Sequence, residues 1–205
     1  MSHRKRTKIR ISPAVPLLLA VFALLCSPLL LWALLGAAIV HECGHYALLR
    51  RFGARVSCLR LTVFGAEMQV EDVARLSYGR EMLAVLAGPL TNLLLALALG
   101  AVGRWWDGAY LFAGTNLVLG IFNLLPARPL DGGRLLWLGV AWISEPFTAD
   151  RITVRVSLIT SLLLLTGGIW VLWRWGGSPF LLLGAVGLAT GNLREMGLVK
   201  CPGKR

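Results

Sequence analysis

Long apolar runs alternate with short polar segments along almost the whole chain. Apolar residues make up 57% of the 205 residues, and charged residues only 15%, against about 25% in an ordinary soluble domain. A membrane-spanning helix needs about 20 mostly apolar residues. The runs therefore predict an all-α polytopic membrane protein with about six transmembrane helices, at about 11–26, 28–49, 82–102, 109–126, 152–173 and 178–193.

The lysines and arginines indicate how these helices cross the membrane. Six spans with a cytoplasmic N-terminus place 19 of the 21 cations on the cytoplasmic side, whereas a single long helix over 14–40 gives five spans and places only 7 there. Cytoplasmic loops carry an excess of Lys and Arg, so we expect six spans, two cytoplasmic termini and a basic cytoplasmic tail at 1–10. This topology accounts for the net charge of +11 without a nucleic-acid partner, because the cations form no single patch.

The polar segment between the second and third predicted helices has the alternation of a β-hairpin. Within 57–71, apolar and polar residues alternate, and the phase of the alternation changes after Phe64-Gly65, as in two strands joined by a turn. An unpaired strand edge could bind an extended substrate segment by strand addition. The alternative is a plain loop at the membrane interface.

The motif His41-Glu42-Cys43-Gly44-His45 lies at the end of the second apolar run. On a helix, His41 and His45 share one face, where two imidazoles can bind one metal ion. Glu42 lies about 100° from His41 and about 60° from His45 around the helix axis, so its carboxylate can reach a metal-bound water without being a ligand. This spacing is typical of zinc hydrolases, in which one helical turn provides two ligands and the general base.

A catalytic zinc ion needs a third protein ligand, and the remaining histidine, His3, lies in the basic tail. Asp131 follows the fourth predicted span, so the topology places it at the same membrane face as the histidine motif. Around it, Pro126, Pro129 and Gly132-Gly133 interrupt the helical pattern, and broken backbone at membrane depth is tolerated only where it lines a polar cavity. We favour Asp131 as the third ligand; the alternative is an ordinary Asp-Gly turn.

Three segments, in this order, resemble the site-2 protease family of intramembrane metalloproteases: HECGH at 41–45, AGPLTN at 87–92 and NLLPARPLDGG at 123–133. The resemblance covers about residues 10–195 and is strongest to the stage IV FB sporulation proteases. It implies that His41, His45 and Asp131 bind Zn²⁺, that Glu42 activates water, that Asn123 helps to hold substrate, and that the hairpin is membrane-associated. From the residues alone, Asn123 could equally pack a helix, and Gly88-Pro89 with Asn92 could form only a packing notch.

The resemblance also implies a function. We expect an intramembrane zinc endopeptidase of the bacterial cell membrane, cleaving a membrane-associated or single-span protein near the cytoplasmic face. A sigma-factor precursor is the candidate substrate, and a membrane protein could act as inhibitor. Residues 1–205 would form one metalloprotease domain, with neither the CBS domain nor the PDZ domain found in related enzymes. A membrane metal-ion transporter could also use intramembrane His and carboxylate groups. An inactive membrane scaffold is the third alternative.

Overall fold

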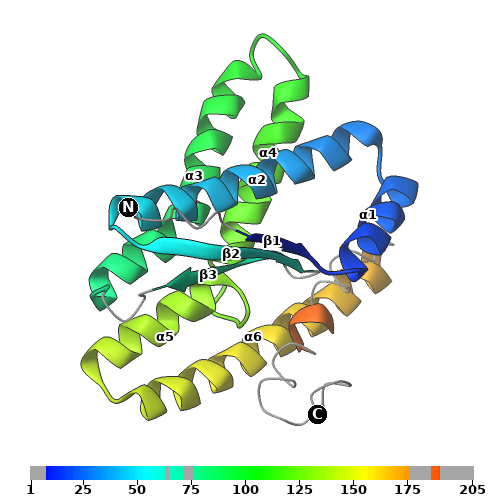
Figure 1. Ribbon diagram of the computed structural model, residues 1–205. Coiled ribbons are helices and arrows are strands. Elements are labelled where there is room, and N and C mark those ends of the chain that lie inside the picture. Colours follow the sequence, from blue (N-terminus) through cyan, green and yellow to red (C-terminus); the bar gives the residue numbers. More distant parts are fainter. Residues whose placement is uncertain (1–7, 63–64, 72–75, 176–185, 190–205) are drawn as a thin grey trace, which may run out of the picture. The chain divides into compact units, whose positions relative to one another are not determined.

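The computed structural model describes residues 8–62, 65–71, 76–175 and 186–189. It is mostly helical, with a small three-stranded sheet. The chain divides into two compact units, Met1–Phe122 and Asn123–Arg205, and each is described by itself (Figure 1).

The first unit contains the helices that carry the histidine motif and the AGPLTN segment. The histidine motif lies on α2 (Pro28–Arg51), and the AGPLTN segment lies on α3 (Tyr78–Val102). The described residues of this unit also form α1 (Ala14–Leu25) and α4 (Gly108–Asn123), whose last residue begins the second unit. The start of α2 follows from its sequence, because the Ser27 hydroxyl accepts a hydrogen bond from the Leu30 N–H at 3.3 Å. Pro28 occupies the first helical turn, where a missing N–H costs nothing.

Within the part of the chain that the structure describes, three helices are long and apolar enough to cross a membrane: Pro28–Arg51, Tyr78–Val102 and Pro146–Arg174. They contain the predicted spans 28–49, 82–102 and 152–173. The predicted spans 11–26 and 109–126 correspond to the shorter helices α1, with 12 residues, and α4, with 16. Most of the predicted span 178–193 lies outside the described residues. A count of six spans therefore stays a prediction.

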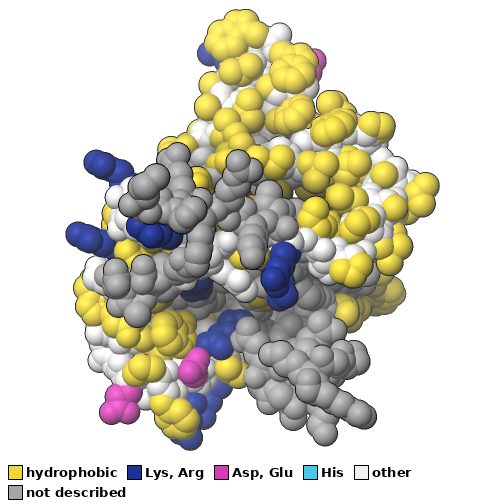
Figure 2. Space-filling view, viewed as in Figure 1, with side chains coloured by type: hydrophobic (Ala, Val, Ile, Leu, Met, Phe, Trp, Pro, Cys, Tyr) yellow, Lys and Arg dark blue, Asp and Glu magenta, His cyan; other side chains and the backbone are white. Residues whose placement is uncertain are grey.

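Large apolar side chains cover the outside of the first unit's helices (Figure 2). Trp32, Leu94 and Leu97 are between 65% and 73% exposed. A soluble protein rarely leaves such contiguous apolar surface in water, whereas lipid tails cover it at no cost. The helices and their surfaces are those of an integral membrane protein.

The sheet has the strand order β1-β2-β3. Strands β2 and β3 lie between α2 and α3 along the chain, whereas β1 precedes α1. Strands β2 (Arg55–Thr62) and β3 (Gly65–Glu71) pair antiparallel, with Leu59 opposite Met68. They cover the residues predicted as a hairpin, except that 63–64, at its turn, lie outside the described residues. Strand β1 (Lys8–Ile11) adds a parallel partner to β2. The tail predicted at 1–10 thus ends in a strand, and its cytoplasmic location stays a prediction. The first span was predicted to start at about residue 11, but Ile11 is the last residue of β1 and α1 starts at Ala14.

The second unit is built on α5 (Asp131–Ile143) and α6 (Pro146–Trp175). Leu138 of α5 and Ala149 and Thr153 of α6 are fully buried. Helix α5 was not expected, because the sequence places Pro and Gly residues immediately before and within its first turn. Its first residue is Asp131, so the position of α5 sets the position of the Asp131 backbone.

Candidate zinc site

The two histidines of the motif face each other on consecutive turns of α2. Their Nε2 atoms are 3.1 Å apart, and their rings are nearly perpendicular, at 84°, with centroids 4.7 Å apart. His41 is 5% exposed and His45 is partly buried. The structure thus brings together the two imidazoles that the i, i+4 spacing predicts.

Helix α3 fixes the orientation of His45. The Nδ1 atom of His45 lies 2.9 Å from the carbonyl oxygen of Ala84. Because a carbonyl can only accept, Nδ1 carries the proton in this contact, and Nε2 keeps its lone pair facing His41. A backbone carbonyl on the second ring nitrogen is the usual way in which a protein holds a metal-binding histidine in the correct tautomer.

The geometry of the histidine pair fits a zinc ion. Two nitrogen ligands of a tetrahedral zinc ion lie about 3.3 Å apart, given Zn–N distances of about 2.0 Å. The observed separation of 3.1 Å between the two Nε2 atoms is close to this value. The Nε2 atoms of His41 and His45 therefore have the separation of two of the four ligands of a tetrahedral zinc ion.

The AGPLTN segment of α3 packs against the histidine helix. A Cβ atom added at Gly88 would lie 2.5 Å from Cε1 of His45, and one added at Gly44 would lie 2.5 Å from Oγ1 of Thr91. Asn92 is fully buried, and its amide donates a hydrogen bond to the carbonyl of Ala37 at 3.2 Å. Ala37 lies one turn before His41. The segment is thus a packing notch, as one interpretation of the sequence expected, and the notch positions α2 and the His45 ring.

Replacing Gly88 by Ala tests this notch. The new methyl group would overlap the His45 ring, so the ring must shift; we expect zinc affinity to fall by about tenfold, at the lower end of the range for disturbed metal-ligand orientation. The matched control is Gly100→Ala on the same helix, where a Cβ atom meets nothing within 4 Å. Zinc affinity is measured in detergent by competition with a coloured chelator. Equal affinities for the two variants would contradict the role given to Gly88.

Asp131 is the first residue of α5 and is partly buried. The backbone before it is tightly folded: the Leu130 N–H donates to the Ala127 carbonyl at 2.8 Å, and the Arg128–Pro129 peptide bond is cis. A Cβ atom at Gly133 would lie 2.6 Å from the carbonyl carbon of Ala127, so only glycine permits this approach. Asp131 and the two glycines after it form the first turn of a helix rather than an isolated Asp-Gly turn.

The other two predicted site residues also lie on helices. Glu42 is partly buried on the same turn of α2 as His41, and Asn123 is the partly buried last residue of α4. Sequence reasoning missed the contribution of Ala84, which acts through a backbone carbonyl and leaves no signal in an isolated motif. It found Gly88 as part of a packing notch but did not connect that glycine with His45.

Known proteins are similar to this chain in sequence and in fold. Residues 29–106 and 101–166 match peptidase family M50. The chain is 34% identical over 169 residues to Stage IV sporulation protein FB of Bacillus subtilis, covering 80% of this chain and 58% of that protein. It is 29% identical over 107 residues to a zinc metalloprotease of Methanocaldococcus jannaschii, covering 49% of this chain and 31% of the relative. The solved site-2 protease from Methanocaldococcus jannaschii has a similar fold, with a TM-score of 0.71 at 21% identity over 98% of this chain and 97% of that chain.

A histidine pair shaped for zinc on an apolar helix, in a fold shared with a site-2 protease, is typical of the membrane-embedded zinc metallopeptidases. The chain belongs to peptidase family M50, which confirms the resemblance seen in its three motifs. It spans a little over half of the length of the Bacillus subtilis relative.

Proposed function

We propose that the chain is an intramembrane zinc endopeptidase that hydrolyses a peptide bond of a membrane-associated protein near the cytoplasmic face. The observation that carries the proposal is the histidine pair: two Nε2 atoms 3.1 Å apart, one of them oriented by a backbone carbonyl. Membership of family M50 and the apolar character of α2 and α3 support the same activity.

The proposed zinc ligands are His41, His45 and Asp131. The histidines have the required separation, and Asp131 stands at the matching place of the NLLPARPLDGG motif. Zinc supplies, when bound, a Lewis acid that polarises the peptide carbonyl and lowers the pKa of a water molecule to about 7.

Side chains of the protein transfer the proton and hold the substrate. Glu42 accepts the proton of the attacking water and returns it to the nitrogen of the leaving amine, as a general base that becomes a general acid. The carboxamide of Asn123 holds the substrate and can donate a hydrogen bond to the developing oxyanion. Strand β3 is an edge of the sheet and can pair with an extended substrate segment, which exposes peptide bonds that a helix would hide.

The substrate and the topology are part of the same proposal. The similarity to Stage IV sporulation protein FB supports a role in sporulation, with a membrane-associated sigma-factor precursor as the first substrate to test. The distribution of 19 of 21 cations supports six spans in the bacterial cell membrane with both termini in the cytoplasm.

The proposal is tested by metal removal in a defined system. The purified chain is placed in liposomes with a sigma-factor precursor, and the size of the precursor is followed on a gel. We expect a zinc chelator to stop cleavage and one equivalent of zinc to restore it, because in this proposal zinc polarises the peptide carbonyl and activates the water. Cleavage that persists when no zinc is detectable would contradict the proposal. Zinc flux into the liposomes that survives Glu42→Gln would favour a transporter instead.

A further inference from the structure

Arg128 attaches the segment that leads into Asp131 to α6. The Arg128 backbone N–H donates a hydrogen bond to Oγ of Ser157 at 2.7 Å. The Arg128 side chain forms an ion pair with Asp150, with Nη2 and Oδ1 2.6 Å apart. Both the main chain and the side chain of a residue three positions before Asp131 are therefore bound to the same helix.

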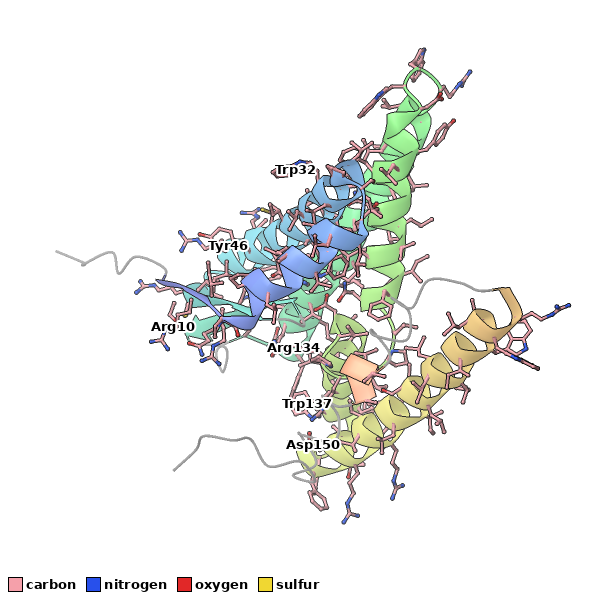
Figure 3. All side chains as sticks on the ribbon, turned by 90° about the vertical axis from the view of Figure 1, so that its right-hand side faces the viewer. Arg10, Trp32, Tyr46, Arg134, Trp137 and Asp150 are labelled. Carbon is pink, nitrogen blue, oxygen red and sulfur yellow. The ribbon has the colours of Figure 1, made fainter. Side chains whose placement is uncertain are left out.

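Asp150 also binds α5 on the other side of Asp131. The same oxygen, Oδ1, accepts a hydrogen bond from the indole N–H of Trp137 at 2.9 Å. Figure 3 shows Trp137 and Asp150 on the neighbouring helices α5 and α6. One carboxylate thus connects the chain three residues before Asp131 with the chain six residues after it.

One face of α6 makes these contacts, and the part of this face beyond Asp150 is buried. Asp150 and Ser157 are seven residues apart, so they lie on one face two turns apart. Thr153 lies between them, and both Thr153 and Ser157 are fully buried. The anchoring groups are therefore presented by a rigid, packed element rather than by a loop.

The Arg128–Asp150 pair is too exposed to serve mainly as a source of stability. The two side chains are 23% and 55% exposed, and an ion pair of this kind contributes little to the free energy of unfolding because water screens it. The pair also has a geometric effect, because it restricts the backbone three residues before Asp131. Metal sites are sensitive to such restraint, because groups that orient a ligand affect metal affinity strongly.

We propose that Asp150 is a positioning residue for zinc binding. By holding Arg128 and Trp137 it fixes the start of α5, and with it the direction in which Asp131 presents its carboxylate. This inference rests on the proposed function, in which Asp131 is a zinc ligand.

The test measures zinc affinity of the full chain in detergent, by competition with a coloured chelator. We expect Asp150→Ala and Arg128→Ala each to weaken zinc binding by about tenfold. Because the proposed effect of the Arg128 side chain passes through Asp150, the double variant is expected to bind zinc no more weakly than Asp150→Ala. Arg128→Lys keeps the charge and is expected to recover most of the affinity.

Two exposed residues provide matched controls. Arg151→Ala removes a cation that stacks on Phe147, 4.3 Å from the ring centroid, and Glu145→Ala removes an acid directly before α6. Both variants are expected to bind zinc as tightly as the natural chain. If they weaken it as much as Asp150→Ala does, the effect is general and the inference is overturned.

The remaining outcomes separate this inference from the proposed function. Unchanged affinity in Asp150→Ala, or additive losses in the double variant, would overturn the inference alone if Asp131→Asn still weakens zinc binding. Unchanged affinity in Asp131→Asn would overturn both. Far-ultraviolet circular dichroism of the zinc-free chains shows whether Asp150→Ala folds. If it does not, Arg128→Ala decides, because it removes the same ion pair and leaves Asp150 as the acceptor for Trp137; unchanged zinc affinity in that variant overturns the inference.

Discussion

Replacing Glu42 by Gln is expected to reduce peptide cleavage by about 10²–10⁴-fold, the range that a general acid–base residue contributes, and to leave zinc bound. Gln has nearly the shape of Glu but cannot accept a proton from water. Glu42 lies on the same helical turn as His41 and is partly buried, so the substitution disturbs neither the histidine pair nor the helix. Cleavage is followed with a membrane-associated sigma-factor precursor, and zinc is measured in the same preparation.

The control for this variant is Glu145→Gln, the same chemical change at an exposed acid directly before α6. It is expected to cleave at the natural rate. A Glu42→Gln chain that cleaves normally would remove Glu42 from the role of general base. Loss of zinc together with loss of cleavage would instead make Glu42 a ligand.

Replacing Asp131 by Ala is expected to weaken zinc binding by more than about 100-fold and to abolish cleavage at ordinary zinc concentrations. Residues that only orient a ligand are worth about 10–100-fold in metal affinity, so removal of a ligand is expected to exceed that range. Two imidazoles alone leave the ion without the third protein ligand of a catalytic site. Zinc affinity is measured by chelator competition, and cleavage is measured with and without added zinc.

Asp107→Ala is the matched control, because Asp107 is an exposed acid in the connection between α3 and α4. Its affinity for zinc is expected to equal that of the natural chain. An Asp131→Ala chain with the affinity of this control would exclude Asp131 from the ligand set and leave the third ligand to be found elsewhere.

The parts of the structure that were predictable are those with local signals. The i, i+4 spacing places His41 and His45 on one face wherever a helix forms, and the structure shows their Nε2 atoms 3.1 Å apart on that face. The alternation within 57–71 predicts paired strands because a strand has a period of two residues. The apolar runs predict helices α2, α3 and α6 because a helix that crosses a membrane needs about 20 mostly apolar residues.

The parts that escaped prediction depend on partners far away in the sequence. Four residues, Lys8–Ile11, have too little pattern to indicate a strand, and their partner β2 lies about 50 residues later. Helix α5 begins within a Pro- and Gly-rich segment because the Gly133 backbone packs against Ala127, a contact that no local pattern indicates. Asp150 has the sequence context of a solvated charge, and only the packing of α5 on α6 brings Arg128 and Trp137 to it.

The most direct test of the central claim is X-ray absorption at the zinc edge of the purified chain, with zinc content determined in parallel. We expect about one zinc ion per chain, with two imidazole nitrogens and oxygen donors at about 2.0–2.1 Å, and one imidazole fewer after His41→Ala. A spectrum with sulfur at about 2.3 Å, or one in which the imidazole signal is unchanged by His41→Ala, would contradict the account.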